Sequence, residues 1–175
     1  MDNKAMFKLS YGLFVVTAND GKDNGCITNT AIQVAAEPTR ISVAVQKGNY
    51  TRELIEQTGE FVVSVLTEEA AFWVFQHYGF QSGRDTDKFA NLPVARTENG
   101  VRYVEGCTNA VISGKVVNTV DCGTHTLFIA AVTDAEKLAN GEMTVITGDG
   151  AKEFNLTLLT PGSIASENAE NHSTA

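Results

Sequence analysis

Asn24-Gly25-Cys26-Ile27-Thr28-Asn29-Thr30 is followed, after Pro38, by the run Ile41-Ser42-Val43-Ala44-Val45 and then by Lys47-Gly48-Asn49-Tyr50-Thr51. The first segment places a turn beside small side chains, which leave the backbone N–H and C=O groups accessible to a flat polar ligand. The second alternates apolar residues as a half-buried strand does. The third predicts the end of that strand and the start of a helix. Together they predict a polar shelf with an anion site at one end.

The anion site is predicted from the helix that begins near Asn49. Apolar residues recur after it at helical spacing, and Gly59 is a suitable C-terminal stop. The first N–H groups of a helix have no partners within the helix, so they can bind a phosphate, to which Lys47 and Thr51 would add a charge and a hydroxyl. The same residues are also typical of a hairpin followed by an ordinary capped helix, so the pattern alone leaves both interpretations open.

The rest of the chain is rich in predicted strands. A β-branched run at 11–18 and the turn formers at 19–25 predict a hairpin whose second strand runs from Ile27 to Val34. Further strands are predicted at 40–46, 61–66, 101–104, 110–120, 126–132 and 143–146, and helices at 49–58 and 68–77. A closed or nearly closed antiparallel barrel is the economical way to cover so many strand edges. No G-x-G-x-x-G motif is present, so a separate dinucleotide-binding domain has no support.

Composition indicates one globular domain. The chain has 175 residues, of which 43% are hydrophobic and 19% are charged, and we assign the domain to 1–162 and a disordered tail to the polar residues 163–175. The net charge of −8, without a basic run, argues against nucleic acid as a partner. No segment approaches the roughly 20 apolar residues of a membrane span, and no signal peptide is evident. We therefore expect a cytoplasmic protein that does not bind membranes.

The three cysteines, Cys26, Cys107 and Cys122, include no C-x-x-C pair. Their odd number and spacing predict reduced thiols rather than a disulfide framework or a metal site. Cys26 lies on the proposed shelf, where its small size is a sufficient reason for its presence.

Several motifs, taken in order, resemble the flavin reductase-like family of FMN-binding split barrels. They are Tyr11-Gly12-Leu13-Phe14-Val15-Val16-Thr17, Asn24 to Thr28, Lys47 to Thr51, Gly59-Glu60-Phe61-Val62-Val63-Ser64-Val65-Leu66, Ser82-Gly83-Arg84-Asp85-Thr86-Asp87-Lys88-Phe89 and Gly123-Thr124-His125-Thr126-Leu127-Phe128. The resemblance covers roughly residues 6 to 147, and within the family the chain is similar to flavoredoxin and to the flavin reductase domain of high-molecular-weight rubredoxin. It implies a mainly β fold, a split β-barrel that is antiparallel and Greek-key-like, with short helices.

The resemblance also implies FMN as the cofactor. FMN is favoured over FAD because one helix N-terminus offers a single compact anion site, and no second glycine-rich loop is present for an adenylate. The residues of the shelf, the helix start and the charged loop near 84 are the cofactor-binding candidates. They are Asn24, Gly25, Cys26, Ile27, Thr28, Asn29, Thr30, Lys47, Asn49, Tyr50, Thr51, Ser82, Arg84 and Lys88.

The implied activity is transfer of hydride from NADH or NADPH to flavin. His125 is the catalytic candidate because the family position that it matches faces the flavin, although Thr124 stands where relatives commonly have an acidic residue. An FMN-dependent electron-transfer protein that passes electrons between protein partners is the alternative, and a binding domain without redox activity is a third. The chain carries no rubredoxin cysteines, so an electron acceptor such as rubredoxin would be a separate molecule.

A homodimer is the expected assembly. The segment Phe72-Trp73-Val74-Phe75 is too apolar to leave one side in water, and split barrels of the family commonly build flavin sites at a subunit interface.

Overall fold

The computed structural model describes residues 2–139 and 145–147. The chain divides into two units, residues 11–145 on one hand and residues 1–10 with 146–175 on the other. The smaller unit contains the 3₁₀-helix η1 (Asn3–Lys8). The boundaries between the two units fall within the short strands β1 (Ser10–Gly12) and β9 (Val145–Thr147). All features below belong to the larger unit.

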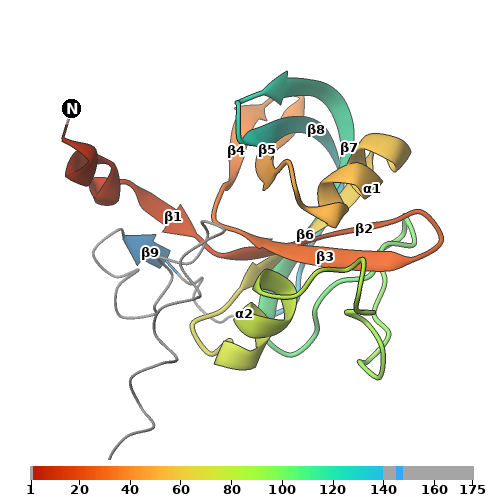
Figure 1. Cartoon of the computed structure of the whole chain (residues 1–175). Helices are drawn as coiled ribbons and strands as arrows, with labels where there is room; N and C mark the ends of the chain where they lie inside the picture. Colours follow the sequence, from red (N-terminus) through yellow and green to blue (C-terminus); the bar gives the residue numbers. More distant parts are fainter. Residues whose placement is uncertain (1, 140–144, 148–175) are drawn as a thin grey trace, which may run out of the picture. The chain divides into compact units, whose positions relative to one another are not determined.

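Seven strands of the larger unit form one antiparallel sheet (Figure 1). They are β2 (Phe14–Asn19), β3 (Asp23–Thr28), β4 (Ala31–Ala36), β5 (Thr39–Gln46), β6 (Glu60–Leu66), β7 (Thr108–Asp121) and β8 (His125–Lys137). Their order across the sheet is β3-β2-β6-β7-β8-β5-β4. The prediction of a mainly β, antiparallel fold is confirmed.

The two edge strands of this sheet, β3 and β4, follow each other in sequence. The chain crosses between the edges at Asn29 and Thr30, where the backbone N–H of Ala44 in β5 donates to the carbonyl of Thr30 at 3.1 Å. The hydroxyl of Thr28 donates to the carbonyl of Ala44 at 2.9 Å. We call these contacts the closing seam, because they bring the end of β3 to β5. The predicted single strand from Ile27 to Val34 was wrong, since the chain must bend here to change edges.

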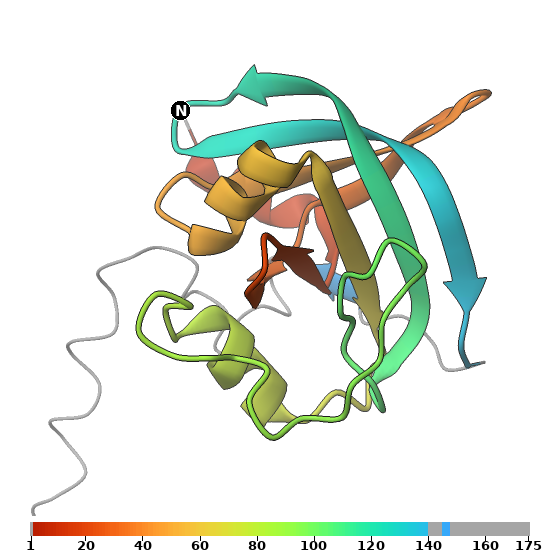
Figure 2. The ribbon, with the colours of Figure 1, turned by 90° about the vertical axis from the view of Figure 1, so that its right-hand side faces the viewer.

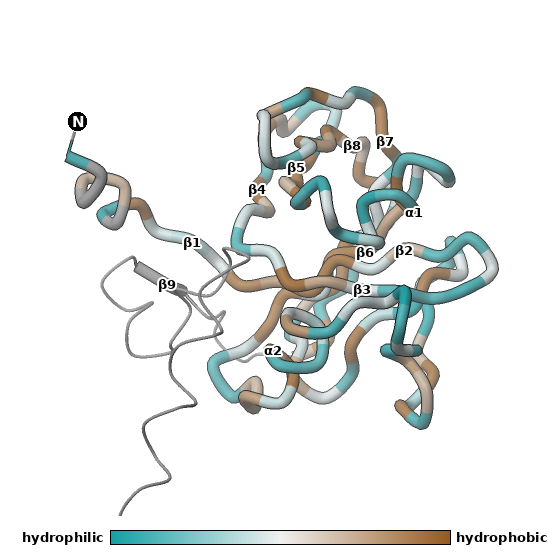
Figure 3. The backbone as a smooth tube through the Cα atoms, in the orientation of Figure 1, coloured by the Kyte–Doolittle hydropathy of each residue, from teal (hydrophilic) through white to brown (hydrophobic). Residues whose placement is uncertain are grey.

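The core lies between the curved faces of the sheet, where β2 and β6 are buried over most of their length and β8 alternates between buried and half-buried residues in its first half. Val16, Val43, Phe61 and Phe128 are each fully or almost fully buried in it. The tube in Figure 3 is hydrophobic along β2 and β6 and hydrophilic in the hairpin turn that follows β2. Strand β6 is buried on both faces because a second apolar cluster, which includes Val62, packs on its outer side.

Two helices lie on opposite sides of the β2–β3 hairpin (Figures 1 and 2). Helix α1 (Tyr50–Thr58) begins and ends as predicted, with Asn49 as N-cap and Gly59 in the left-handed conformation at φ 73°. Helix α2 (Phe72–Gly79) begins four residues later than the predicted helix 68–77. The difference arises because the chain before it forms a turn, in which the N–H of Ala70 donates to the carbonyl of Thr67.

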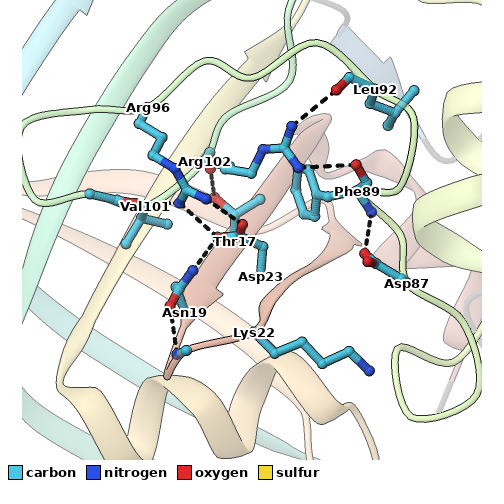
Figure 4. Close-up of polar contacts among 12 residues, drawn as sticks. Thr17, Asn19, Lys22, Asp23, Asp87, Phe89, Leu92, Arg96, Val101 and Arg102 are labelled. Atoms are coloured by element: carbon cyan, nitrogen blue, oxygen red, sulfur yellow. Dashed lines mark hydrogen bonds and ion pairs between the residues drawn. The ribbon is translucent and has the colours of Figure 1, made fainter.

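The long connection between α2 and β7 is organised by Arg102, which is buried. Its guanidinium donates to the carbonyls of Phe89 and Leu92, each at 3.0 Å (Figure 4). It also donates to the carbonyl of Pro93 at 2.9 Å. The predicted strand 101–104 was wrong, because this segment makes only an isolated bridge between Arg96 and Arg102. Its polar groups bond mainly to the neighbouring loop rather than to a strand.

No helix within the described ranges is long and apolar enough to cross a membrane. Of the predicted late strand 143–146, only residues from 145 onward are described. The predicted tail at 163–175 lies outside the described residues.

Candidate functional site

Several predicted site residues lie around the start of α1, which contacts the β2–β3 hairpin and the 82–84 loop, and the loop that enters α1 contacts the end of β7. A buried polar cluster connects α1 to the hairpin. The amide of Asn24 donates to the hydroxyl of Thr51 at 2.9 Å, and both residues are almost completely buried. The other amide atom, Oδ1 of Asn24, is buried without a hydrogen-bond partner among the described residues. It therefore retains the capacity to accept one hydrogen bond.

Cys26 lies beside this cluster. Burial raises the pKa of the Cys26 thiol, although the hydrogen bond with Thr51 and the charge of Lys88 partly offset this rise. A thiol with a raised pKa stays protonated near neutral pH and is a poor nucleophile. The position of Cys26 agrees with a packing role on the shelf.

Lys88 supports the shelf from inside the protein. Its ammonium group donates to the carbonyl of Gly25 at 2.9 Å and to the carbonyl of Tyr78 at 3.0 Å, and only 2% of the residue is exposed. Burial lowers the pKa of Lys88, and the neighbouring Cys26 partly offsets this effect. The structure thus places Lys88 next to the predicted shelf, with its charge directed at backbone carbonyls of β3 and α2.

The 82–84 loop packs against the hairpin and α1. Gly83 lies so close to Asn24 that a Cβ atom would come within 1.9 Å of Oδ1, so this position requires glycine. Lys22 donates to the carbonyl of Gly83 at 2.9 Å. The Arg84 guanidinium lies 5.0 Å from the Tyr50 ring centroid and also pairs with Glu53.

Lys22 therefore lies on the same side of the molecule as Tyr50, with its ammonium group 5.9 Å from the centroid of that ring. The turn that presents it is firmly held (Figure 4): the N–H of Gly21 donates to Asn19 at 2.7 Å, and Arg96 pairs with Asp23 at 2.7 Å. Sequence reasoning read this segment only as a turn and missed Lys22. The available signal was a cation between turn formers, two residues before the predicted polar shelf.

The hydroxyl side chains at the end of the shelf serve the closing seam. Thr28 and Thr30 lie with their hydroxyl oxygens 3.1 Å apart, and Asn29 accepts from the Thr30 hydroxyl at 3.4 Å. Thr28 is buried, whereas Asn29 and Thr30 are half-buried. Ile27 is buried in the strand before them. The seam thus leaves two small polar residues partly accessible.

At the start of α1, the side chain of Asn49 accepts from the backbone N–H of Thr51 at 3.4 Å. Lys47 is bound elsewhere: its ammonium group donates to the carboxylate of Asp121 at 2.7 and 2.8 Å. Asp121 is the last residue of β7, and the sequence analysis did not single it out. Ser82, also predicted, accepts from the backbone N–H of Arg84 at 3.2 Å.

His125 begins β8 and lies directly opposite Gln46 in the β5–β8 register. The residue is half-buried, and its Nδ1 lies 2.8 Å from the hydroxyl of Thr124. The backbone N–H of Lys47 donates to the carbonyl of Thr124 at 3.0 Å. These contacts join the turn that carries His125 to the loop that enters α1.

An apolar cavity lies apart from these residues. It measures about 170 Å³ and is lined by Phe14, Ala31, Ile32, Gln33, Thr39, Ile41, Val63, Ile112, Val132 and Ala135. None of these is a predicted site residue, and the lining offers few polar groups to orient a ligand.

Comparison with known proteins supplies the remaining evidence. The family profile described as "Flavin reductase like domain" matches residues 6–153. The high molecular weight rubredoxin of Moorella thermoacetica is 41% identical over 143 residues, which cover 81% of this chain and 62% of that protein. The ferric-chelate reductase (NAD(P)H) of Archaeoglobus fulgidus is 38% identical over 144 residues, or 82% of this chain and 85% of that protein.

Among solved structures, an FMN-binding protein from Thermus thermophilus superposes with a TM-score of 0.72 at 21% identity, covering 81% of this chain and 84% of its own. This likeness shows the fold and confirms the predicted split barrel.

Proposed function

Since the chain belongs to the family of flavin reductase like domains, we propose that it is an FMN-binding oxidoreductase that transfers hydride from NADH or NADPH to flavin. The observation that carries the proposal is the contact between the His125 turn and the loop that enters α1, through the bond from Lys47 N–H to the Thr124 carbonyl. This contact links the turn that carries the half-buried imidazole of His125 to the loop before α1, and the first N–H groups of that helix can hold an anion.

The described residues fit a flavin in three respects. The buried Oδ1 of Asn24 has no hydrogen-bond partner among the described residues, and it could accept from a ligand hydroxyl or N–H. Lys22 and Arg84 place two cations beside Tyr50, near the start of α1, where a phosphate would be stabilised. Asn29 and Thr30 are only half-buried at the end of the shelf, so their polar groups remain accessible.

The bound flavin would supply the two-electron chemistry. The overall reaction consumes a hydride from the nicotinamide and a proton, and it yields reduced flavin and oxidised nicotinamide. We propose that His125 orients the nicotinamide or donates that proton near neutral pH. Cys26 is not assigned a chemical role, because its thiol is buried and protonated.

The cofactor is tested by releasing the chromophore from purified protein and identifying it by mass. FMN is expected because one helix start and one cationic pair form a single compact anion site. Recovery of FAD, or failure to bind any flavin on reconstitution, would contradict the FMN proposal.

The activity is tested by mixing the flavin-loaded protein with NADH and, separately, with NADPH in a stopped-flow instrument while flavin absorbance is followed. Bleaching of the flavin by either nicotinamide supports a reductase. The His125→Ala variant should retain FMN and react about 10- to 1000-fold more slowly, the scale of a lost acid–base or positioning contact. An unchanged rate with intact FMN binding would make His125 a structural residue.

A second candidate function is an FMN-dependent electron carrier. It is favoured by the similarity to a high molecular weight rubredoxin, although the chain spans only 62% of the length of that relative. In this case the flavin would react with neither nicotinamide, and it would exchange electrons with a separate protein such as a rubredoxin. Reduction of the bound flavin by a reduced protein donor, but not by NADH or NADPH, would decide for this function.

We further propose a homodimer. The structure divides the apolar segment that suggested it: Val74 and Phe75 are buried within the protomer, whereas Phe72 is 49% and Trp73 is 48% exposed. Two adjacent exposed aromatic side chains on α2 favour a partner that covers them. Light scattering should give about twice the chain mass of 18.8 kDa, and a Trp73→Ser variant should shift the equilibrium toward monomer. A monomer at micromolar concentration with flavin bound would reject the proposal.

A further inference from the structure

We propose that Asp121 and Lys47 form a positioning pair that holds the β7–β8 turn so that His125 faces the flavin site. This inference rests on the proposed catalytic role of His125. Neither residue would touch the reacting atoms, and both would act through the histidine.

The Asp121 carboxylate binds two groups that fix the first half of the turn. Lys47 donates to its two oxygens at 2.7 and 2.8 Å, and the backbone N–H of Gly123 donates to Oδ1 at 2.8 Å. The hydrogen bonds from Lys47 and from Gly123 hold the pKa of Asp121 below its ordinary value, so the carboxylate is ionised at neutral pH. Gly123 has φ 81°, a conformation in which glycine is favoured, and the carboxylate holds this residue in place.

Lys47 fixes the second half of the turn. Its backbone N–H donates to the carbonyl of Thr124 at 3.0 Å, while the N–H of Cys122 donates across the turn to the carbonyl of His125 at 2.9 Å. Lys47 therefore binds the turn through both its side chain and its backbone. The pair holds the whole turn: Lys47 bonds to Asp121 and Thr124, and Asp121 bonds to Gly123. The remaining turn residue, Cys122, bonds to the backbone of His125.

This arrangement changes the role expected for Lys47. The sequence suggested that its charge binds a phosphate, but the carboxylate of Asp121 already neutralises that charge and would repel an anion placed beside it. Of the two cations next to Tyr50, Arg84 is likewise paired with a carboxylate, that of Glu53, whereas Lys22 donates to the carbonyl of Gly83 and keeps its charge for an anion. Lys47 is thus assigned to the histidine turn rather than to the anion.

The pair is exposed, with side-chain exposures of 40% for Lys47 and 71% for Asp121. Exposed ion pairs contribute little to global stability, so its loss should leave the melting temperature almost unchanged. A catalytic group that is misplaced by about 1 Å can nevertheless cost on the order of 100-fold in rate. The signature of a positioning pair is therefore a slower flavin reduction with unchanged folding and unchanged FMN affinity.

The test is a double-mutant cycle on the rate of flavin reduction, with Asp121→Ala, His125→Ala and the double variant in the flavin-loaded full chain. Asp121→Ala should slow reduction about 5- to 50-fold, and it should have no further effect when His125 is already alanine, because its contribution passes through the histidine. Lys47→Met should behave like Asp121→Ala and should leave the affinities for FMN and riboflavin unchanged. Glu56→Ala is the matched control, because it removes a carboxylate from an exposed ion pair with Arg52 on α1.

A second readout does not depend on activity. The ring Cε1–H signal of His125 in the NMR spectrum, identified by its loss in His125→Ala, should shift or broaden in Asp121→Ala and remain in place in Glu56→Ala. An unmoved signal overturns the proposal, even for a protein that reacts with neither nicotinamide and so lacks the proposed reductase function. Two other results would overturn it. One is a rate loss from Asp121→Ala that is just as large when His125 is already alanine. The other is a Lys47→Met variant that binds FMN more weakly but binds riboflavin as before.

Discussion

Replacing Arg102 with methionine should destabilise the larger unit by releasing the 89–93 loop. The guanidinium donates three hydrogen bonds to main-chain carbonyls and lies 5.0 Å from the Phe89 ring centroid (Figure 4). None of the ion pairs among the described residues includes Arg102. Its charge is therefore compensated by carbonyl dipoles, and methionine would fill much of the volume without satisfying them.

The expected loss follows from two opposing contributions. Hydrogen bonds to a charged group contribute about 1.5–3 kcal/mol each, so three give a gross effect of roughly 4.5–9 kcal/mol. Removing a buried charge recovers several kcal/mol of desolvation, and the partly exposed Leu92 and exposed Pro93 allow water to reach two of the carbonyls. We expect a net loss of about 2–4 kcal/mol in the free energy of unfolding.

The assay is equilibrium urea unfolding of the flavin-free protein, followed by far-UV circular dichroism. Arg96→Met is the matched control: its guanidinium pairs with Asp23 and binds the Gly100 carbonyl, but the side chain is 39% exposed, so its removal should cost less than about 1 kcal/mol. Arg102→Lys should fall between the two, because an ammonium group cannot reach all three carbonyls with planar geometry. Equal midpoints and slopes for Arg102→Met and Arg96→Met would refute the reasoning.

Two further predictions concern reactivity and backbone conformation. At pH 8 a maleimide should label the exposed Cys122 first, the half-buried Cys107 more slowly and the buried Cys26 only after unfolding. Mass mapping of the labelled peptides checks this order. Labelling of Cys26 in the folded protein at the rate of Cys122 would contradict it. Gly59→Ala should lower the free energy of unfolding by about 1–2 kcal/mol, because φ is 73° at this position after α1. Gly48→Ala should be nearly neutral, because nothing lies within 4 Å of the added Cβ. Equal urea unfolding midpoints for the two variants would contradict this.

Sequence pattern predicted the elements whose apolar spacing and capping residues lie within the element or directly beside it. Alternating apolar residues located β5, and the Asn49 and Gly59 caps located α1 almost to the residue. The break at Asn29 was not predictable in this way, because it depends on hydrogen bonds to Ala44, which is distant in sequence. The segment 101–104 has the composition of a strand, but the carbonyls around Phe89 determine its conformation.

The candidate site shows the same division. The family resemblance is confirmed by the profile match, and Asn24 and Thr51 do lie together, joined by a hydrogen bond across 27 residues of sequence. Lys22 and Asp121 were missed because a residue in or beside a turn reveals its partner only once the strands are in register. The predicted domain 1–162, the choice of FMN, the homodimer and the cytoplasmic location stay predictions.

The closing seam has a consequence for local motion. Strand β6 pairs with β7 over seven registered residue pairs, whereas the meeting of β3 with β5 depends on the Thr30–Ala44 backbone bond and the hydroxyl of Thr28. Opening a barrel at the point with the fewest cross-strand bonds requires the least free energy, so the amide of Ala44 should exchange with solvent by local opening well before the amides of β6. The wall that carries the half-buried polar residues is then also the wall that opens first, and a ligand seated across it would slow that exchange.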